Sequence, residues 1–462
     1  MIKKYKPINK TSQIACIFIC LLLAFATGCS QQPRTFETIH EAALKGDVDA
    51  QLELSYRYAN GQGVPQDITQ AAEWFKKAAE QGNIEAQVKI GLCCANGSGV
   101  PKDLTKAVKW YQKAADQGNA IGQLYLGNCY EQGEGVTKDA TKAVELYLKS
   151  AEQGNMEAQN KLGIVYMDGI GVPKDLTKSV EWIRKAAEQG NAVSQFYLGD
   201  CYKQGRGVQQ NTTEAVKWYQ KAAEQDFTFA QVYLGRCYLD GVGVSKNLTK
   251  AIEWYRKAAE QGDATAQFCL GSFYEQGEGV AKDLTKAAEW YQNAAYQGDV
   301  MSQYNLGQCY RTGEGVPKDL TKAIEWLKKA AEQGNVRAQY VLGLCYFAGH
   351  GVPKDLIKAA EWFQKAANQG DAQAQYNLGV CYFKSYGVPK DLTKAVEWFR
   401  KAADQGDESA QFNLAVCYEN GSGMPKDSAK AIEWLKKATD QGHVEAQEAL
   451  DKLTGRGGND RK

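Results

Sequence analysis

A G-x-G-V turn recurs along this chain at a fixed spacing of 36 residues. Its second glycine, followed by Val or in the last copy by Met, stands at Gly63, Gly99, Gly135, Gly171, Gly207, Gly243, Gly279, Gly315, Gly351, Gly387 and Gly423. Eleven units therefore run from Asp47 to Gly442 without an insertion or deletion. A fixed period of this length is typical of arrays in which each unit is one supersecondary element that covers its neighbour's apolar face. The period predicts a stacked array.

The unit that begins at Asp299 shows the pattern of the first predicted helix. Asp299 stands where a helix N-cap belongs. Gln303, Leu306, Gly307 and Tyr310 follow at spacings of three and four residues. This spacing places them on one side of a helix, which we expect to be buried.

Glycine and proline separate this helix from a second one. Gly313 and Gly315 can adopt the positive φ that ends a helix and closes a tight turn, and Pro317 prevents the helix from resuming. Asp319 can cap the next helix. The apolar residues of that second helix are Ala323, Trp326, Leu327 and Ala330, and Gly334 follows its end. Each unit therefore predicts a helix, a turn and a second helix.

The repeated pattern A-x-x-x-L-G-x-x-Y-x-x-G-x-G-V-x-x-D-x-x-K-A-x-x-W/Y-x-x-K-A-A-x-x-G resembles the Sel-one-like repeat, a relative of the tetratricopeptide repeat. The resemblance covers residues 47 to 442 and is specific because it recurs eleven times. It implies an all-α fold, an α/α solenoid with a right-handed superhelix of eleven 36-residue helix-turn-helix repeats. It also implies a scaffold or adaptor role rather than catalysis.

The two ends of the array are expected to be half-repeat caps. Residues Phe36 to Lys45 match a lone second helix, and residues Val444 to Leu453 match a lone first helix. Glu448 and Asp451 give the last helix the polar surface that a terminal cap needs. We expect the solenoid to span 36–453 and residues 454–462 to be a disordered tail.

The first residues have the pattern of an export signal. Several lysines without an acid precede an apolar run from Ile14 to Ala26, which is too short to span a bilayer. The sequence Ala-Thr-Gly-Cys ending at Cys29 resembles a bacterial lipobox, although lipoboxes most often have leucine where Ala26 stands. We therefore expect a lipoprotein signal peptide over residues 1–28, a lipid on Cys29 and a short tether over 29–35.

That lipid would make the protein an outer-membrane lipoprotein that faces the periplasm or the cell surface. Ala24-Phe25-Ala26 also fits an ordinary signal peptidase, so a periplasmic or secreted protein is the alternative.

Composition and motifs argue against several other classes of function. The formal net charge is +1, without the basic surplus that nucleic-acid binding needs. His40, His350 and His443 stand far apart and lack metal-ligand spacing. The G-x-G turns lack the lysine and threonine of a phosphate loop, and no catalytic set can be singled out. We expect a protein that is not an enzyme, binds no metal, cofactor or nucleic acid, and is a monomer.

Tryptophan and cysteine also follow the repeat. All ten tryptophans occupy one repeat position, as Trp326 does, between alanines at i−3 and i+4. We expect them to pack between consecutive units, although stacked sugars would also suit exposed indoles. Eight cysteines share another position, where Val165 and Phe273 also occur. Equivalent helices of stacked repeats should lie about 9–10 Å apart, too far for disulfides. Buried free thiols are therefore expected.

Residues that vary between units are the candidates for partner binding. In tetratricopeptide proteins, first-helix positions two, five, nine and twelve after the cap line the concave surface, and here position five is mostly aromatic from Phe196 onward. We predict a groove over residues 300 to 420 that binds a peptide or helix. Its predicted residues are Tyr304, Gln308, Arg311, Tyr340, Leu344, Phe347, Tyr376, Val380, Phe383 and Phe412. The alternative for position five is partial core packing between first helices.

Two functions fit this pattern. The first is a membrane-tethered, non-catalytic scaffold that binds envelope or secreted proteins. The second is a glycan-binding lipoprotein of cell-wall or exopolysaccharide assembly, in which the tyrosine row would stack on sugars.

Overall fold

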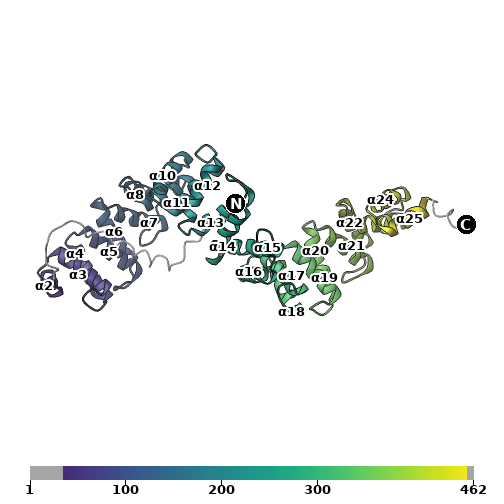
Figure 1. Cartoon of the computed structure of the whole chain (residues 1–462), viewed down its shortest axis with the longest axis horizontal. Coiled ribbons are helices and arrows are strands. Elements are labelled where there is room, and N and C mark those ends of the chain that lie inside the picture. The colour runs from purple at the N-terminus through teal and green to yellow at the C-terminus, as the bar shows by residue number, and fades with distance from the viewer. Residues whose placement is uncertain (1–34, 455–462) are drawn as a thin grey trace. The chain divides into compact units, whose positions relative to one another are not determined.

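The computed structural model describes residues 35–454, and every regular element in this range is an α-helix (Figure 1). The chain divides into two units, the first ending at Trp182 and the second beginning at Ile183. Helix α10 (Leu176–Glu188) contains this division. Within each unit, helices that follow one another in sequence pack side by side. Each unit is therefore an all-α solenoid of helix pairs, as the repeat pattern predicts.

The first unit begins with the lone helix α2 and continues with helix pairs. Its helices before α10 are α2 (Phe36–Leu44), α3 (Val48–Asn60), α4 (Ile68–Glu80), α5 (Ile84–Asn96), α6 (Leu104–Asp116), α7 (Ala120–Gln132), α8 (Ala140–Glu152) and α9 (Met156–Asp168).

The second unit continues the same alternation and ends with the lone helix α25. Its helices after α10 are α11 (Ala192–Gln204), α12 (Thr212–Ala223), α13 (Thr228–Asp240), α14 (Leu248–Glu260), α15 (Ala264–Gln276), α16 (Leu284–Tyr296), α17 (Val300–Thr312), α18 (Leu320–Glu332), α19 (Val336–Ala348), α20 (Leu356–Asn368), α21 (Ala372–Lys384), α22 (Leu392–Asp404), α23 (Glu408–Asn420), α24 (Ser428–Asp440) and α25 (Val444–Thr454).

The helix ends follow the predicted capping chemistry. The Asp299 side chain accepts a hydrogen bond from the backbone N–H of Ser302 at 2.7 Å, and α17 ends at Gly313 with φ 87°. Asp319 caps α18 by accepting from the N–H of Lys322 at 3.0 Å. Gly315 must lack a side chain for a further reason, because a Cβ there would lie 2.0 Å from the carbonyl oxygen of Leu284. The turn at Gly315 therefore lies directly against α16, the second helix of the preceding repeat.

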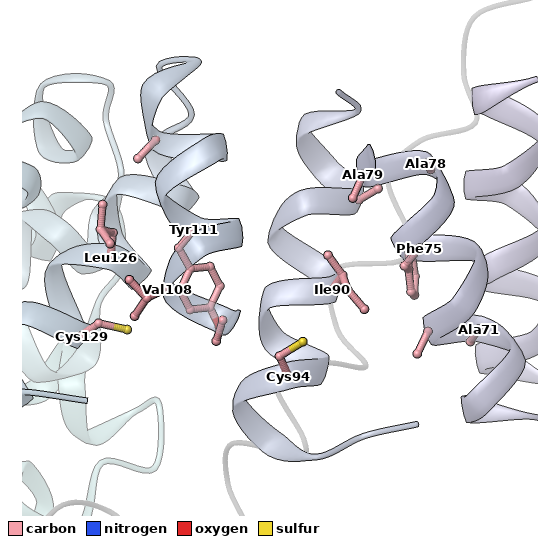
Figure 2. Close-up of a cluster of buried hydrophobic side chains, with 14 of the residues drawn as sticks. Ala71, Phe75, Ala78, Ala79, Ile90, Cys94, Val108, Tyr111, Leu126 and Cys129 are labelled. Atoms are coloured by element: carbon pink, nitrogen blue, oxygen red, sulfur yellow. The ribbon is translucent and has the colours of Figure 1, made fainter. Parts of the chain in front are cut away.

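The core of a helix pair is built where a glycine of the first helix faces a ring of the second. A Cβ on Gly343 of α19 would lie 2.6 Å from ring carbons of Phe363 of α20, and Gly379 meets Phe399 in the same way. Figure 2 shows the corresponding region of the first unit, where Tyr111 of α6 lies in a buried cluster with side chains of the neighbouring helices. The glycine lets the two helices approach closely around a fully buried ring.

A hydrogen-bonded relay of glutamines links consecutive repeats at one end of the helices. Nε2 of Gln369, after α20, donates to Oε1 of Gln339 in α19 at 2.8 Å. Nε2 of Gln339 donates in turn to the backbone carbonyl of Ala331, in the last turn of α18, at 3.0 Å. That carbonyl also accepts the backbone N–H of Gly334 at 3.0 Å, so the glutamine adds a second hydrogen bond at the C-terminus of α18. We call this the glutamine relay.

The glutamine relay recurs in both units. In the first unit, Gln117 donates to Gln87 at 2.9 Å and Gln87 donates to the carbonyl of Ala79 at 3.3 Å. In the second, Gln405, Gln375 and Ala367 repeat the arrangement. Each relay therefore joins a helix pair to the pair before it.

The array ends as predicted, with half-repeat caps. Helix α2 matches the predicted lone second helix, and α25 matches the predicted lone first helix. In α25 the relay glutamine, Gln447, is exposed and donates to Asp451 of its own helix at 2.9 Å. Asp451 occupies the place of the core glycine, so α25 presents a carboxylate where another helix pair would need close contact.

The prediction that tryptophan packs between consecutive repeats is confirmed. Trp326 is 6% exposed and lies in a buried cluster with Ala287 and Tyr291 of the preceding repeat. Trp362 packs in the same way against Ile324 and Leu327. The Lys329 ammonium lies 3.9 Å from the ring centroid of Trp326, so a cation covers one face of the indole.

Replacing Gly343 with alanine tests the glycine–ring contact. Helix propensity alone would make Gly343→Ala stabilising by about 1 kcal/mol. Because the added methyl collides with a buried ring, we expect the free energy of unfolding, measured with urea, to fall by about 1–2 kcal/mol. Another repeat shows a pair of residues that avoids this collision. Ala415 and Leu435 stand at the repeat positions of Gly343 and Phe363 and pack in one buried cluster. The double variant Gly343→Ala, Phe363→Leu should recover part of the loss, and a single variant as stable as the wild type would contradict the contact.

Replacing Gln339 with methionine tests the glutamine relay. The change removes a donor to Ala331 and an acceptor for Gln369. We therefore expect the local free energy of unfolding to fall by about 1–3 kcal/mol. Amide hydrogen exchange should then be faster in α18 and α19. The matched control is Gln447→Met, whose exposed side chain bonds only within α25 and should change stability by about 0.5 kcal/mol or less. Equal effects of the two substitutions would count against the relay.

Candidate protein-binding face

The predicted binding residues lie on one side of α17, α19 and α21. Spacings of four and three residues place positions five, nine and twelve of each helix on a common side. Most of these side chains are half-buried, whereas Arg311 and Leu344 are exposed. We call this surface the first-helix face, and its residues are Tyr304, Gln308, Arg311, Tyr340, Leu344, Phe347, Tyr376, Val380 and Phe383.

The α17 part of the first-helix face is a polar chain of hydrogen bonds. Nε of Arg311 donates to Oε1 of Gln308 at 2.6 Å. Nε2 of Gln308 donates to the hydroxyl oxygen of Tyr304 at 2.9 Å. Three residues that differ from repeat to repeat therefore form one connected set, which fixes the exposed guanidinium relative to the helix.

The α19 part is apolar and is supported from below by the core. The rings of Tyr340 and Phe347 lie 6.1 and 6.5 Å from the buried ring of Phe363, measured between centroids. Leu344 stands between them in the helix and is 36% exposed. Tyr340 therefore packs on the core, as the alternative for position five predicts, and is also half-exposed, while its part in partner binding stays a prediction.

The α21 part repeats this arrangement. Tyr376 and Phe383 lie 6.1 and 6.3 Å from the buried ring of Phe399. Val380 packs against the same buried cluster. Helices α19 and α21 thus present similar apolar sets in consecutive repeats.

One residue of this surface was missed at the sequence level. Tyr386 lies in the turn after α21, is 37% exposed, and packs edge-on against Phe347 at 5.7 Å between ring centroids. The turn itself departs from the repeat, because Ser385 takes the place of the first glycine and adopts φ 62°. This departure from G-x-G was the signal in the sequence.

Phe412 does not extend the apolar surface of α19 and α21. Its ring stacks on His443 at 4.8 Å between centroids and packs with the last buried cluster, which contains Leu435. Position twelve of its helix is Glu419, which forms an ion pair with Lys426 at 2.8 Å. The pairing of an apolar residue at position nine with phenylalanine at position twelve, present on α19 and α21, is therefore not continued on α23.

Two lysines lie beside the phenylalanine rings of this surface, whereas the carboxylates of Asp371 and Asp407 lie close enough to Tyr340 to raise its pKa. The Lys354 ammonium lies 6.0 Å from the ring centroid of Phe347, and that of Lys384 lies 5.5 Å from Phe383. Burial raises the pKa of Tyr340 and of Tyr376, so both phenols stay neutral near pH 7. The lysines beside Phe347 and Phe383 suit an apolar segment that carries carboxylates at these two places.

The ten cysteines within residues 35–454 are free thiols, and eight of them are buried. Burial raises the pKa of Cys381 to about 11, which leaves almost no reactive thiolate near neutral pH.

Within residues 35–454 no group of three His, Cys, Asp or Glu side chains is placed to hold a metal ion. Within the described residues, no helix has the length and apolar character needed to cross a membrane. The predicted lipidation residue, Cys29, lies outside the described residues.

Stacked helix pairs with a variable first-helix surface define an α-solenoid repeat protein, a class whose members generally mediate protein–protein interaction. The chain belongs to the Sel1 repeat family. The family's repeat matches it eleven times, over residues 48–83, 84–119, 120–155, 157–191, 192–227, 228–263, 264–299, 300–335, 336–371, 372–407 and 408–443. Sel1 repeat proteins are typically non-catalytic scaffolds. A comparison with curated proteins gives no match.

Solved structures support this assignment. The chain is 40% identical to a protective antigen present in uropathogenic Escherichia coli strains that displays an SLR fold, with a TM-score of 0.80. That match covers 92% of this chain and 91% of the other. A Sel1 repeat protein from Oxalobacter formigenes is 35% identical with a TM-score of 0.54, over 67% of this chain and 89% of the other.

Proposed function

We propose that this protein is a non-catalytic scaffold of the bacterial cell envelope that binds a partner protein on the first-helix face. The observation that carries the proposal is the apolar surface of α19 and α21. Leu344, Phe347, Val380, Phe383 and Tyr386 are half-buried or exposed, and they stand at places that vary between repeats. Packing within the array alone does not require Leu344 to be apolar, since it is 36% exposed.

The chemistry of this surface favours a peptide segment as the ligand. Supported aromatic rings with one exposed edge are the groups that anchor protein interfaces. Lys354 and Lys384 at the edge favour a segment that places carboxylates beside its apolar residues. Such a segment would lie across consecutive first helices, with one anchor for each repeat.

Variants of exposed residues separate binding from stability. Leu344→Glu places a carboxylate on the binding surface without removing a core ring. Its matched control is Ile357→Glu in the same repeat, where Ile357 is 61% exposed on the second helix. We expect Leu344→Glu to abolish capture of envelope proteins and Ile357→Glu to leave capture unchanged, with equal helical content in both.

The tyrosine row gives a second readout. Tyr340→Ala and Tyr376→Ala should reduce capture per folded molecule and also lower stability, because both rings touch the core. If stability falls while capture per folded molecule stays unchanged, the groove proposal is wrong. Retention of purified peptidoglycan or polysaccharide, in place of protein, would support the glycan alternative instead.

The envelope location rests on the N-terminal sequence. We infer that Cys29 carries a lipid and anchors the protein in the outer membrane, facing the periplasm or the cell surface. Mass spectrometry of the mature N-terminus should find an acylated Cys29, and Cys29→Ser should release the protein from the membrane fraction. Cleavage after Ala26 with an unmodified cysteine would contradict the lipid anchor and indicate a periplasmic or secreted protein.

A further inference from the structure

One repeat of the first unit lacks an aromatic ring that the other ten repeats carry. The eleventh residue after the first-helix N-cap is tyrosine in every repeat except the second, where it is Cys94. Cys94 lines a cavity of about 390 Å³ between α4, α5 and α6. Its thiol is drawn in Figure 2 on the helix that carries Ile90. This volume lies within the range of about 300–1,000 Å³ that small-molecule sites occupy.

Other repeats show which groups normally surround that ring. A lysine of the second helix lies over its face, as Lys142 lies 4.5 Å from the ring centroid of Tyr130. An arginine of the preceding repeat can donate to its hydroxyl, as Nη2 of Arg400 donates to the Tyr418 oxygen at 3.1 Å. A lysine over the ring is therefore common at this position, and in three repeats an arginine also donates to the hydroxyl.

Both cations are kept around Cys94 although the phenol is absent from the sequence. Lys106 takes the place of the lysine that covers the ring, and Lys76 takes the place of the arginine that reaches the hydroxyl. Nζ of Lys106 also lies 3.3 Å from Oδ2 of Asp103, and Nζ of Lys76 lies 3.8 Å from Oε1 of Glu80. These are exposed pairs, which water and salt weaken.

A second departure from the repeat adds positive charge to the same cavity. Position 26 is glutamate in nine of the eleven repeats and lysine in two, at Lys109 and Lys217. Lys109 lines the Cys94 cavity, together with Lys113, whose ammonium lies 4.3 Å from the ring centroid of Trp110. The other described lining residues are apolar: Ile90, Val100 and Pro101. Among the described residues that line the cavity there is no carboxylate.

We propose that this cavity binds a small aromatic carboxylate. The aromatic ring of the ligand would occupy the space that tyrosine fills in the other repeats, between Ile90, Cys94 and Trp110. Its carboxylate would lie beside the four lysines of two consecutive repeats that line the cavity. The loss of a phenol and the gain of a lysine, in one repeat and at one cavity, are the two changes that such a ligand requires.

Calorimetric titration of the purified protein with benzoate tests the proposal. We expect saturable binding to the wild type and no saturable binding of the neutral analogue benzyl alcohol. Cys94→Tyr restores the residue of the other repeats and fills the cavity, so it should weaken benzoate binding by more than about tenfold while the protein stays folded. Lys109→Glu leaves the cavity open and should weaken binding by about tenfold through charge alone.

Lys217→Glu is the matched control. Lys217 occupies the same repeat position as Lys109, but its repeat retains the ring at Tyr202, so benzoate affinity should not change. Absence of benzoate binding to the wild type would overturn the proposal. Unchanged benzoate affinity in Cys94→Tyr would also overturn it. So would inorganic phosphate that binds as tightly as benzoate. Each of these two results would mean that the lysines attract anions without an aromatic site.

Discussion

The glutamine relay is the interaction on which the regular stacking of this protein depends. Second helices end against the first helix of the following repeat, where a carbonyl of the last turn accepts a backbone N–H and a side-chain donor as well. Gln339 supplies that donor to Ala331 and receives one from Gln369, so no amide of the set is buried without a partner. Apolar contacts alone would tolerate sliding between helix pairs, whereas these directional bonds fix their register.

This constraint explains why side chains on the first helices, where we propose a binding surface, can vary between repeats. The relay, the core glycine and the ring it faces occupy fixed positions within each repeat, as Gln339, Gly343 and Phe363 do. Positions five, nine and twelve take no part in the relay, so their side chains are free to differ. The polar set of Tyr304, Gln308 and Arg311 can therefore stand beside the apolar sets of α19 and α21 without disturbing the stacking.

The sequence predicts the fold closely because its signals are local and repeated. Asp299, Gly313 and Asp319 mark helix ends through chemistry confined to a few residues. The relay was not predicted, since Gln303 was placed on the buried side of its helix but its partners lie in other helices. Tyr386 was missed for the same reason. The partner and the membrane anchor remain proposals, because neither follows from packing.

The relay also has a consequence for the length of such proteins. Every donor finds its acceptor within the same repeat or in the one before it, as Gln369, Gln339 and Ala331 show. Duplication of one 36-residue unit would therefore reproduce all of these bonds and leave none unmatched. A gene for such a chain can gain or lose whole units in a single step without passing through an unstable intermediate, and each added unit lengthens the surface available for binding by one helix.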